Sequence, residues 1–370
     1  MNKNNTLPIA LTIAGSDPSG GAGIQADLKT FTSLGVYGMS VITAVTSQNT
    51  QKVNSVYPLP AKIVREQLEA VLSDIKPDVI KIGMLANNEI ITVVTDIIKK
   101  YKLKNVILDP VMAAKSGTRL LVGAVHEPPN KRAIHELPLQ KLISQTFLIT
   151  PNAIEAEILT GIKVRARHAV PLLESITKAA EKLIKMGAEN VLIKGGHLRG
   201  DVCKDFLFTG FPTKAFGNDE KNTRLKCVTL SRRRIPTKNT HGTGCTYSSA
   251  IACFLVGATL CGRPKKKGSH IGLPLQIAIQ NARDYLHLAI KNSLHLGKGC
   301  GPVNHLILIQ KAYGCQSPPT TVAAGFSLRK QRNLKVAATS KTTQPKGCGC
   351  QTETLLSMRE EMKKAVKKTK

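Results

Sequence analysis

Short apolar runs alternate with amphipathic stretches of helical length from residue 7 to about residue 311. The apolar run 7–14 has the length of a buried strand, and Ile24, Leu28 and Phe31 then recur on one face of a helix. The same patterns predict further strands at 38–46, 78–82, 105–108, 145–150 and 190–194, and helices at 60–74, 87–101, 153–160, 171–186 and 274–293. This alternation predicts an α/β fold with a mostly parallel, doubly wound sheet flanked by helices.

A few segments interrupt the alternation. Residues 203–208 and 211–216, separated by Thr209 and Gly210, are expected to form a small β-hairpin. Three charged or proline-containing segments are expected to be loop insertions, at 122–136, 218–234 and 262–272.

The chain divides by composition near residue 314. Residues 1–313 are predicted to form one domain, whereas 314–370 form a basic tail without a clear hydrophobic period, which we expect to be disordered apart from one marginal helix over 353–370.

Polar or glycine-rich loops follow the predicted strands. The first is GSDPSGGAG (15–23), between a strand and a helix, and it has neither the Walker sequence nor the dinucleotide-binding spacing. Ligands bind beyond the carboxyl ends of the strands in such sheets. Similar loops at five further positions, SQN, KIGM, DPVM, TPN and KGGH, therefore favour a common pocket.

A second glycine-rich turn lies in PTKNTHGTGCT (236–246), directly before the helix-like stretch 247–256. Gly242 and Gly244 let an anion approach the N–H groups of a helix start, where the helix dipole favours negative charge. Cys245 falls in the first turn, a position that stabilises a thiolate. This arrangement points to group transfer at a phosphate, although such a turn can also serve only to start a helix.

Composition narrows the class of protein. The chain is 42% hydrophobic and has no tryptophan, so its core is expected to be aliphatic. No apolar run reaches the ~18 residues of a membrane span, and the short first run is no convincing signal peptide, so a cytoplasmic protein is expected. Nine scattered cysteines argue against a disulfide framework. Cys348 and Cys350 are interpreted as a chance pair rather than a metal site.

The formal net charge is +29, which attracts polyanions. The basic residues are dispersed, and the clusters at 232–234 and 265–267 are not interleaved with aromatic residues. Solvated surface charge with a basic tail is therefore favoured over a nucleic-acid site.

Seven motifs occur in the order typical of one family and cover most of residues 7–311: LTIAGSDPSGGAGIQADLKTF, YGMSVITAVTSQNT, KIGMLA, LDPVMAAKSG, ITPNAIEAEIL, VLIKGGH and TKNTHGTGCT. The chain thus resembles the hydroxymethylpyrimidine/phosphomethylpyrimidine kinases of thiamine biosynthesis, in the ribokinase-like superfamily. The resemblance implies two phosphorylations by MgATP, of 4-amino-5-hydroxymethyl-2-methylpyrimidine and then of its monophosphate. A small-molecule substrate and a homodimer are expected, and neither a membrane nor a nucleic acid is expected as a partner.

The resemblance also implies roles for the acceptor side of the site. Cys245 matches the position of the catalytic base, and the amides of Gly242, Thr243 and Gly244 would hold the transferring phosphoryl group. Gln48 matches the glutamine that recognises the pyrimidine. The substrate would also be bound by Asp27, otherwise a helix-dipole charge, and by ring-packing walls at Gly15, Val45, Met84 and Val111.

On the nucleotide side, Asp109 and Glu155 match positions near Mg²⁺, and Asn152 is expected near ATP. Asn152 and Glu155 also fit a helix-capping box, which alone could explain them. Lys194 and Lys238 are candidates for the nucleotide phosphates, with solvated surface lysines as the alternative.

Two rival functions remain. A pyridoxal or pyridoxine kinase uses the same scaffold, sometimes with the same cysteine turn, although Gln48 and Met84 favour the pyrimidine. A basic nucleic-acid-binding protein with a vestigial kinase site is supported only by the net charge. A thiamine-linked regulatory protein is a weaker third alternative.

Overall fold

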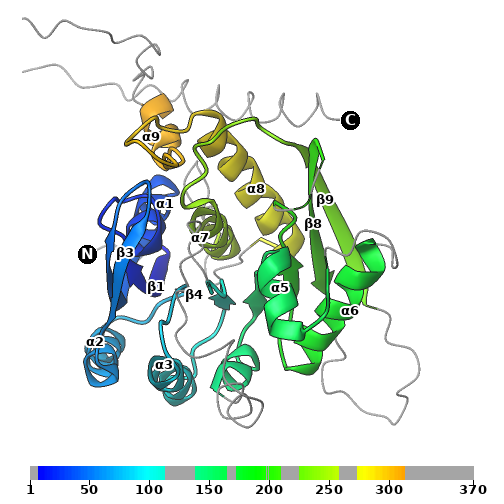
Figure 1. The fold of residues 1–370 in the computed structure, drawn as a ribbon. Coiled ribbons are helices and arrows are strands. Elements are labelled where there is room, and N and C mark those ends of the chain that lie inside the picture. Colours follow the sequence, from blue (N-terminus) through cyan, green and yellow to red (C-terminus); the bar gives the residue numbers. More distant parts are fainter. Residues whose placement is uncertain are drawn as a thin grey trace, which may run out of the picture. The chain divides into compact units, whose positions relative to one another are not determined.

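The computed structural model describes residues 7–112, 138–164, 172–196, 198, 200–209, 225–257 and 273–312. Within these residues, nine strands form one sheet in the order β3-β2-β1-β4-β5-β6-β7-β8-β9 (Figure 1). The strands are β1 (Ile9–Ser16), β2 (Tyr37–Gln48), β3 (Val53–Pro58), β4 (Val79–Ile82), β5 (Val106–Leu108), β6 (Leu148–Ile149), β7 (Val191–Ile193), β8 (Val202–Thr209) and β9 (Lys226–Arg233).

The central strands from β2 to β7 pair in parallel, and β3, β8 and β9 pair antiparallel at the two ends of the sheet. The chain runs outward from β1 to β2 and β3, then returns to β4 on the other side of β1. The strand order therefore reverses between β1 and β4, and ligand sites of doubly wound sheets form at such reversals. The predicted fold class is confirmed.

Helices cover both faces of the sheet (Figure 1). They are α1 (Gly23–Ser33), α2 (Ala61–Asp74), α3 (Asn88–Lys100), α5 (Ala153–Thr160), α6 (Leu172–Lys185), α7 (Thr243–Leu255), α8 (Leu275–Lys291) and α9 (Ile307–Ala312). Helices α1, α7 and α8 pack together on one face, while α2 packs against α3 and α5 against α6.

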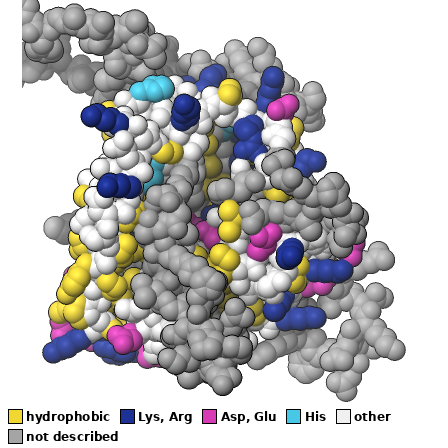
Figure 2. All heavy atoms as spheres, viewed as in Figure 1, with side chains coloured by type: hydrophobic (Ala, Val, Ile, Leu, Met, Phe, Trp, Pro, Cys, Tyr) yellow, Lys and Arg dark blue, Asp and Glu magenta, His cyan; other side chains and the backbone are white. Residues whose placement is uncertain are grey.

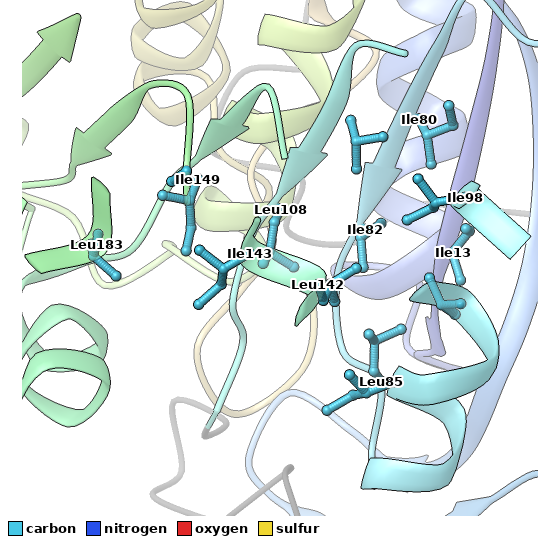
Figure 3. Packing of buried hydrophobic residues seen from close by; sticks show 14 of the residues in the cluster. Ile13, Ile80, Ile82, Leu85, Ile98, Leu108, Leu142, Ile143, Ile149 and Leu183 are labelled. Atoms are coloured by element: carbon cyan, nitrogen blue, oxygen red, sulfur yellow. The ribbon is translucent and has the colours of Figure 1, made fainter. Parts of the chain in front are cut away.

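The larger core lies under α2, α3, α5 and α6, and it is mostly aliphatic, as predicted, with Phe206 and Phe208 as its buried aromatic residues. Figure 3 shows part of this core. The strand residues Ile13, Ile80, Ile82, Leu108 and Ile149 gather there with Ile98 of α3, with Leu183 of α6 and with Leu85, Leu142 and Ile143. Side chains alternate between the two faces of a strand. Because Ile80 and Ile82 face this core, Lys81 between them faces α1 and α7.

The predicted hairpin of 203–208 with 211–216 stays a prediction, because 211–216 lies outside the described residues. The edges of β8 are taken by β7 and by β9, which lies in a segment predicted to be a loop insertion. Strand β3 was not predicted. The predicted strand at 145–150 shortens to Leu148–Ile149.

Residues 211–216, the insertions at 122–136 and 262–272, and Cys348 and Cys350 lie outside the described residues. The chain forms two compact units, Met1–Ile307 and Leu308–Lys370, and of the second the structure describes only 308–312. The predicted domain 1–313 and disordered tail 314–370 stay predictions. Among the described residues, none of the helices has the length and apolar content to cross a bilayer.

Candidate active site

Four neighbouring strands each contribute one charged side chain near the same edge of the sheet. Lys81 lies within β4, Asp109 follows β5, Glu155 lies in the helix after β6, and Lys194 follows β7. Parallel strands end at a common edge, so residues far apart in sequence meet there. The first turn of α7 lies against this group, since a Cβ added at Gly244 would be 3.6 Å from both Asp109 Oδ2 and Lys194 Nζ.

Asp109 and Lys194 form a buried ion pair. Lys194 Nζ donates to Asp109 Oδ1 at 2.6 Å, and the Ser248 hydroxyl of α7 donates to Oδ2 at 3.2 Å. Burial acts to raise the pKa of Asp109, but the ammonium groups of Lys194 and Lys81 outweigh it and hold that pKa below its ordinary value. Lys194 is therefore not a solvated surface lysine. Its charge is held at the predicted nucleotide side.

Asn152 and Glu155 form the capping box that the sequence left as an alternative. Asn152 Oδ1 accepts from the N–H groups of Ile154 and Glu155, and Glu155 Oε2 accepts from the Asn152 N–H at 2.7 Å. Burial raises the pKa of Glu155 to about 7, with Lys194 opposing and Asp109 adding to the increase. A buried carboxyl group with so high a pKa, close to a second carboxylate, is a place that favours a cation.

A second ion pair lies at the reversal point between β1 and β4. Lys81 is fully buried, and its Nζ donates to Asp27 Oδ2 at 2.9 Å. Asp27 also accepts from Thr12 Oγ1 at 2.6 Å and Ser249 Oγ at 2.7 Å. Thr12 and Lys81 are register partners on β1 and β4, which explains how both reach one carboxylate. Both Asp27 oxygens accept hydrogen bonds from the protein, and the residue is fully buried. Its role in binding the substrate stays a prediction.

The two glycine turns meet directly. Gly242 caps α7 in the left-handed conformation with φ 78°, and a Cβ there would lie 1.7 Å from the carbonyl oxygen of Gly21. The His241 ring packs on Gly21 in the same way, since a Cβ there would lie 2.3 Å from the ring. The convergence of the two turns on one place, predicted from their sequences, is confirmed.

Cys245 lies in the first turn of α7 and is partly buried. The Gly23 N–H, at the start of α1, donates to its sulfur. Burial raises the pKa of the thiol to about 11. The Lys81 ammonium acts to lower this pKa, and the carboxylates of Asp27 and Asp109 act to raise it further. The prediction that this helix start stabilises a thiolate is therefore wrong: the residue is a thiol at neutral pH.

Gln48, at the end of β2, lies beside the second turn. Its Nε2 is 3.4 Å from His241 Nε2, and the same ring nitrogen is 2.8 Å from Asp17 Oδ2. Gln48, the residue predicted to recognise the pyrimidine, thus contacts His241 in the turn that carries Cys245.

Three of the four predicted ring-packing residues gather in a small apolar cluster. Met84 is buried with Ala44 and Ala86, and Val111 packs against them. A Cβ at Gly15 would lie 2.8 Å from Met84 Cε, so Gly15 lies directly against the flexible end of the Met84 side chain. Val45 is 47% exposed and pairs across strands with Tyr57, so it lies apart from that cluster.

The remaining predicted residues are Lys238 and Thr243. The Lys238 side chain is exposed, as the surface alternative requires. The Thr243 N–H, predicted to hold a phosphoryl group, makes a long 3.4 Å bond to the Thr240 carbonyl.

Several functional candidates were missed. Lys81 is the clearest, and the signal was available: a charged residue inside the apolar strand VIKI. Asp17 and His241 stood within the quoted motifs but carried no distinguishing pattern. Asp205, which accepts from the Gly195 N–H at 2.9 Å and so holds the KGG loop, could not be connected to it without the fold.

The fold and this site define a small-molecule kinase of the ribokinase-like class. Its structure is similar to that of pyridoxal kinase from Bacillus subtilis in complex with ADP, with a TM-score of 0.64, 33% identity, and coverage of 82% of this chain and 99% of that one. It is also similar to phosphomethylpyrimidine kinase from Clostridium difficile, with a TM-score of 0.55, 38% identity, and coverage of 76% and 99%.

The family model for phosphomethylpyrimidine kinase matches residues 17–304. The hydroxymethylpyrimidine/phosphomethylpyrimidine kinase of Bacillus subtilis is 41% identical over 80% of this chain and 94% of its own length. A bifunctional thiamine biosynthesis protein of Geobacter sulfurreducens is 42% identical over 80% of this chain, which spans only 52% of that protein. The chain belongs to the phosphomethylpyrimidine kinase family, and it is a phosphotransferase.

Proposed function

We propose that this enzyme phosphorylates 4-amino-5-hydroxymethyl-2-methylpyrimidine with ATP, and then phosphorylates the monophosphate to the diphosphate, in thiamine diphosphate biosynthesis. The observation that carries the proposal is the meeting of the two glycine turns. Through it, Gln48 contacts His241, four residues before Cys245 on the same turn. A pyrimidine held by Gln48 would therefore have its hydroxymethyl group near the start of α7.

The chain's own residues supply binding, orientation and proton handling. The Gln48 amide offers a donor and an acceptor to an aminopyrimidine edge, and Met84 and Val111 provide apolar packing. The backbone N–H groups at the start of α7 hold the transferring phosphoryl group, and Lys194 adds positive charge there. Cys245 takes the hydroxyl proton of the first acceptor in its thiolate form, which is a small fraction of the enzyme at neutral pH because the pKa of the thiol is raised to about 11. The second acceptor is a phosphate that needs no base at neutral pH.

Mg²⁺ fits beside the nucleotide phosphates. The supporting observation is the buried pair of carboxyl groups, in which Asp109 contributes to the raised pKa of Glu155, about 7. These two residues would hold the ion or its waters, and the ion would neutralise phosphate charge. Asn152 keeps Glu155 in place through the capping box.

The alternative substrate is pyridoxal, because pyridoxal kinases with bound ADP, AMP-PCP or pyridoxal are among the similar structures. The deciding experiment incubates purified protein with MgATP and either alcohol, then resolves monophosphate and diphosphate products. Formation of the pyrimidine diphosphate, with lower kcat/KM for pyridoxal, is expected. Exclusive phosphorylation of pyridoxal would overturn the proposal.

The proposal includes a homodimer. It is supported by three exposed apolar side chains on β2 and the edge strand β3: Tyr37 is 53% exposed, Val45 47% and Tyr57 65%. Light scattering of the purified protein tests the oligomeric state.

A further inference from the structure

Asp17 organises the first glycine loop. Its Oδ1 accepts from the Ser19 N–H at 2.9 Å and from the Ser19 hydroxyl at 2.7 Å, and its Oδ2 accepts from the Ala22 N–H at 2.8 Å. Burial acts to raise the pKa of Asp17, but hydrogen bonds from His241 and Ser19 lower it to about 2. The carboxylate is therefore ionised at working pH and can only accept hydrogen bonds.

This fixes the state of one nitrogen of His241. Its Nε2 lies 2.8 Å from Asp17 Oδ2, so it must carry a proton and donate. The ring cannot turn away freely, because the His241 N–H donates to the Gly301 carbonyl, the Val303 N–H donates to the His241 carbonyl, and the ring packs on Gly21. A protonated Nε2 is thus held facing Gln48.

The Gln48 amide then has one satisfactory orientation. With its NH₂ toward His241 Nε2, 3.4 Å away, two donors would oppose each other. The other end of the amide lies 3.3 Å from Thr46 Oγ1, whose proton is already donated to the Ser16 carbonyl at 2.9 Å. Turned by 180°, the amide oxygen shares the single Nε2 proton of His241 with Asp17 Oδ2, as the more distant acceptor at 3.4 Å, and the NH₂ group donates to Thr46 Oγ1. Every donor then meets an acceptor.

In that orientation the amide keeps one N–H and one oxygen lone pair for a ligand. An aminopyrimidine presents the complementary pair, an acceptor ring nitrogen beside a donor exocyclic amine. The ring nitrogen of pyridoxal is flanked by a methyl group instead, so pyridoxal cannot use both positions.

We propose that Asp17 and His241 are positioning residues that fix which way round the Gln48 amide faces, and that they thereby set the preference for an aminopyrimidine alcohol over a pyridoxal-like alcohol. This inference rests on the proposed function, because it assumes that Gln48 contacts the acceptor.

Selectivity tests the inference, because a merely structural role lowers binding of both alcohols alike. Dissociation constants for the hydroxymethylpyrimidine and for pyridoxal are measured by calorimetry without ATP, alongside kcat/KM with MgATP. In His241→Ala and in Asp17→Asn, the selectivity for the pyrimidine should fall about tenfold, which corresponds to the loss of one hydrogen bond. His241→Gln, which carries two N–H donors, should restore most of the selectivity.

Ser19→Ala is the matched control. It removes a bond to Asp17 within the same loop but leaves His241 and Gln48 untouched, so selectivity should stay at the wild-type value even where stability falls. Melting temperatures identify any variant that fails to fold, and His241→Gln then provides the comparison.

Equal losses for both alcohols in His241→Ala, with wild-type enzyme preferring the pyrimidine, would overturn the inference alone. A wild-type enzyme that binds pyridoxal more tightly overturns the proposed function, while the change of the ratio in the variants still reports on Asp17 and His241.

Discussion

At the scale of single residues, the proposed base of the first phosphorylation is Cys245, whose surroundings disfavour the thiolate form. Burial and two carboxylates raise the pKa of Cys245 to about 11. A base with this pKa gains about tenfold in its deprotonated fraction with each pH unit above neutrality. The first phosphorylation should therefore accelerate as pH rises from 7 to 9, whereas the second, which needs no base, should not. Separate assays of the two acceptors measure this.

Cys245→Ala should slow the first step by ~10²-fold, the range of a lost general base, and flatten its pH profile. Cys253→Ala is the matched control, because Cys253 is a buried thiol further along the same helix. Equal losses in both steps, or a pH profile unchanged by Cys245→Ala, would exclude Cys245 as the base.

Lys81 and Asp27 should contribute to the stability of the fold as a pair, because each neutralises the buried charge of the other. Lys81→Met leaves the buried Asp27 without its counter-charge, and such changes cost about 3–5 kcal/mol. The double variant Lys81→Met/Asp27→Asn removes both charges and should recover most of the lost stability. Urea unfolding measures both. A double variant no more stable than Lys81→Met would show that the ion pair is not what couples these residues.

At the scale of elements, the hydrophobic periodicity predicted the helices that bury an apolar face. It missed the strand that is held mainly by backbone pairing with its neighbour. The amphipathic patterns of α2, α3 and α6 predicted those helices closely, because each buries one apolar stripe. Strand β9 was missed because its sequence, KCVTLSRR, has only Leu230 buried. It is held by ladder bonds to β8 and by its arginines, one of which pairs with Asp284 on α8, and no local pattern carries that information.

The same distinction applies to the candidate site. The glycine turns were visible because tight backbone approach demands glycine locally. The bond between Asp27 and Lys81, 54 positions apart, needed the β1–β4 register.

Gly242 should be essential for joining the two turns. Gly242→Ala places a Cβ 1.7 Å from the Gly21 carbonyl oxygen, so the turns must separate, and a displacement of this kind costs ~10²-fold or more in kcat/KM. Gly161→Ala is the control: that residue ends α5 with φ 71°, and a Cβ there meets nothing within 4 Å. It should cost about 1 kcal/mol of stability and no activity. Similar activity in the two variants would contradict the role of the contact.

For the whole molecule, the formal net charge is +29, and the Lys and Arg residues among the described residues are not concentrated in one patch. Figure 2 shows Lys and Arg side chains scattered over the visible face. Of the arginine cluster at 232–234, Arg232 pairs with Asp284, and Arg234 donates to the carbonyls of Gly196, Leu198 and Gly200. These arginines are therefore used in holding the β8–β9 end of the sheet, which weakens the nucleic-acid alternative.

The buried carboxyl group of Glu155 should make the free energy of unfolding of the whole protein depend on pH. Its pKa is 4.5 in an unfolded chain and about 7 in the fold, so the folded state binds the proton more tightly. Stability must then fall as pH rises from 4.5 to 7, by about 3 kcal/mol from this group. Glu155→Gln removes the charge, while its amide oxygen can still accept from the Asn152 N–H in the capping box.

The variant should therefore match the wild type near pH 4.5 and exceed its free energy of unfolding at pH 8, although it loses activity. Urea unfolding across this range measures the difference, in which the titrations shared by both proteins cancel. Glu174→Gln, at an exposed ion pair with Lys178, is the surface control and should leave the free energy of unfolding nearly unchanged. A difference between Glu155→Gln and wild type that does not change with pH would mean that the carboxyl group is as easily ionised in the fold as in water. The argument that a cation belongs beside it would then lose its physical basis.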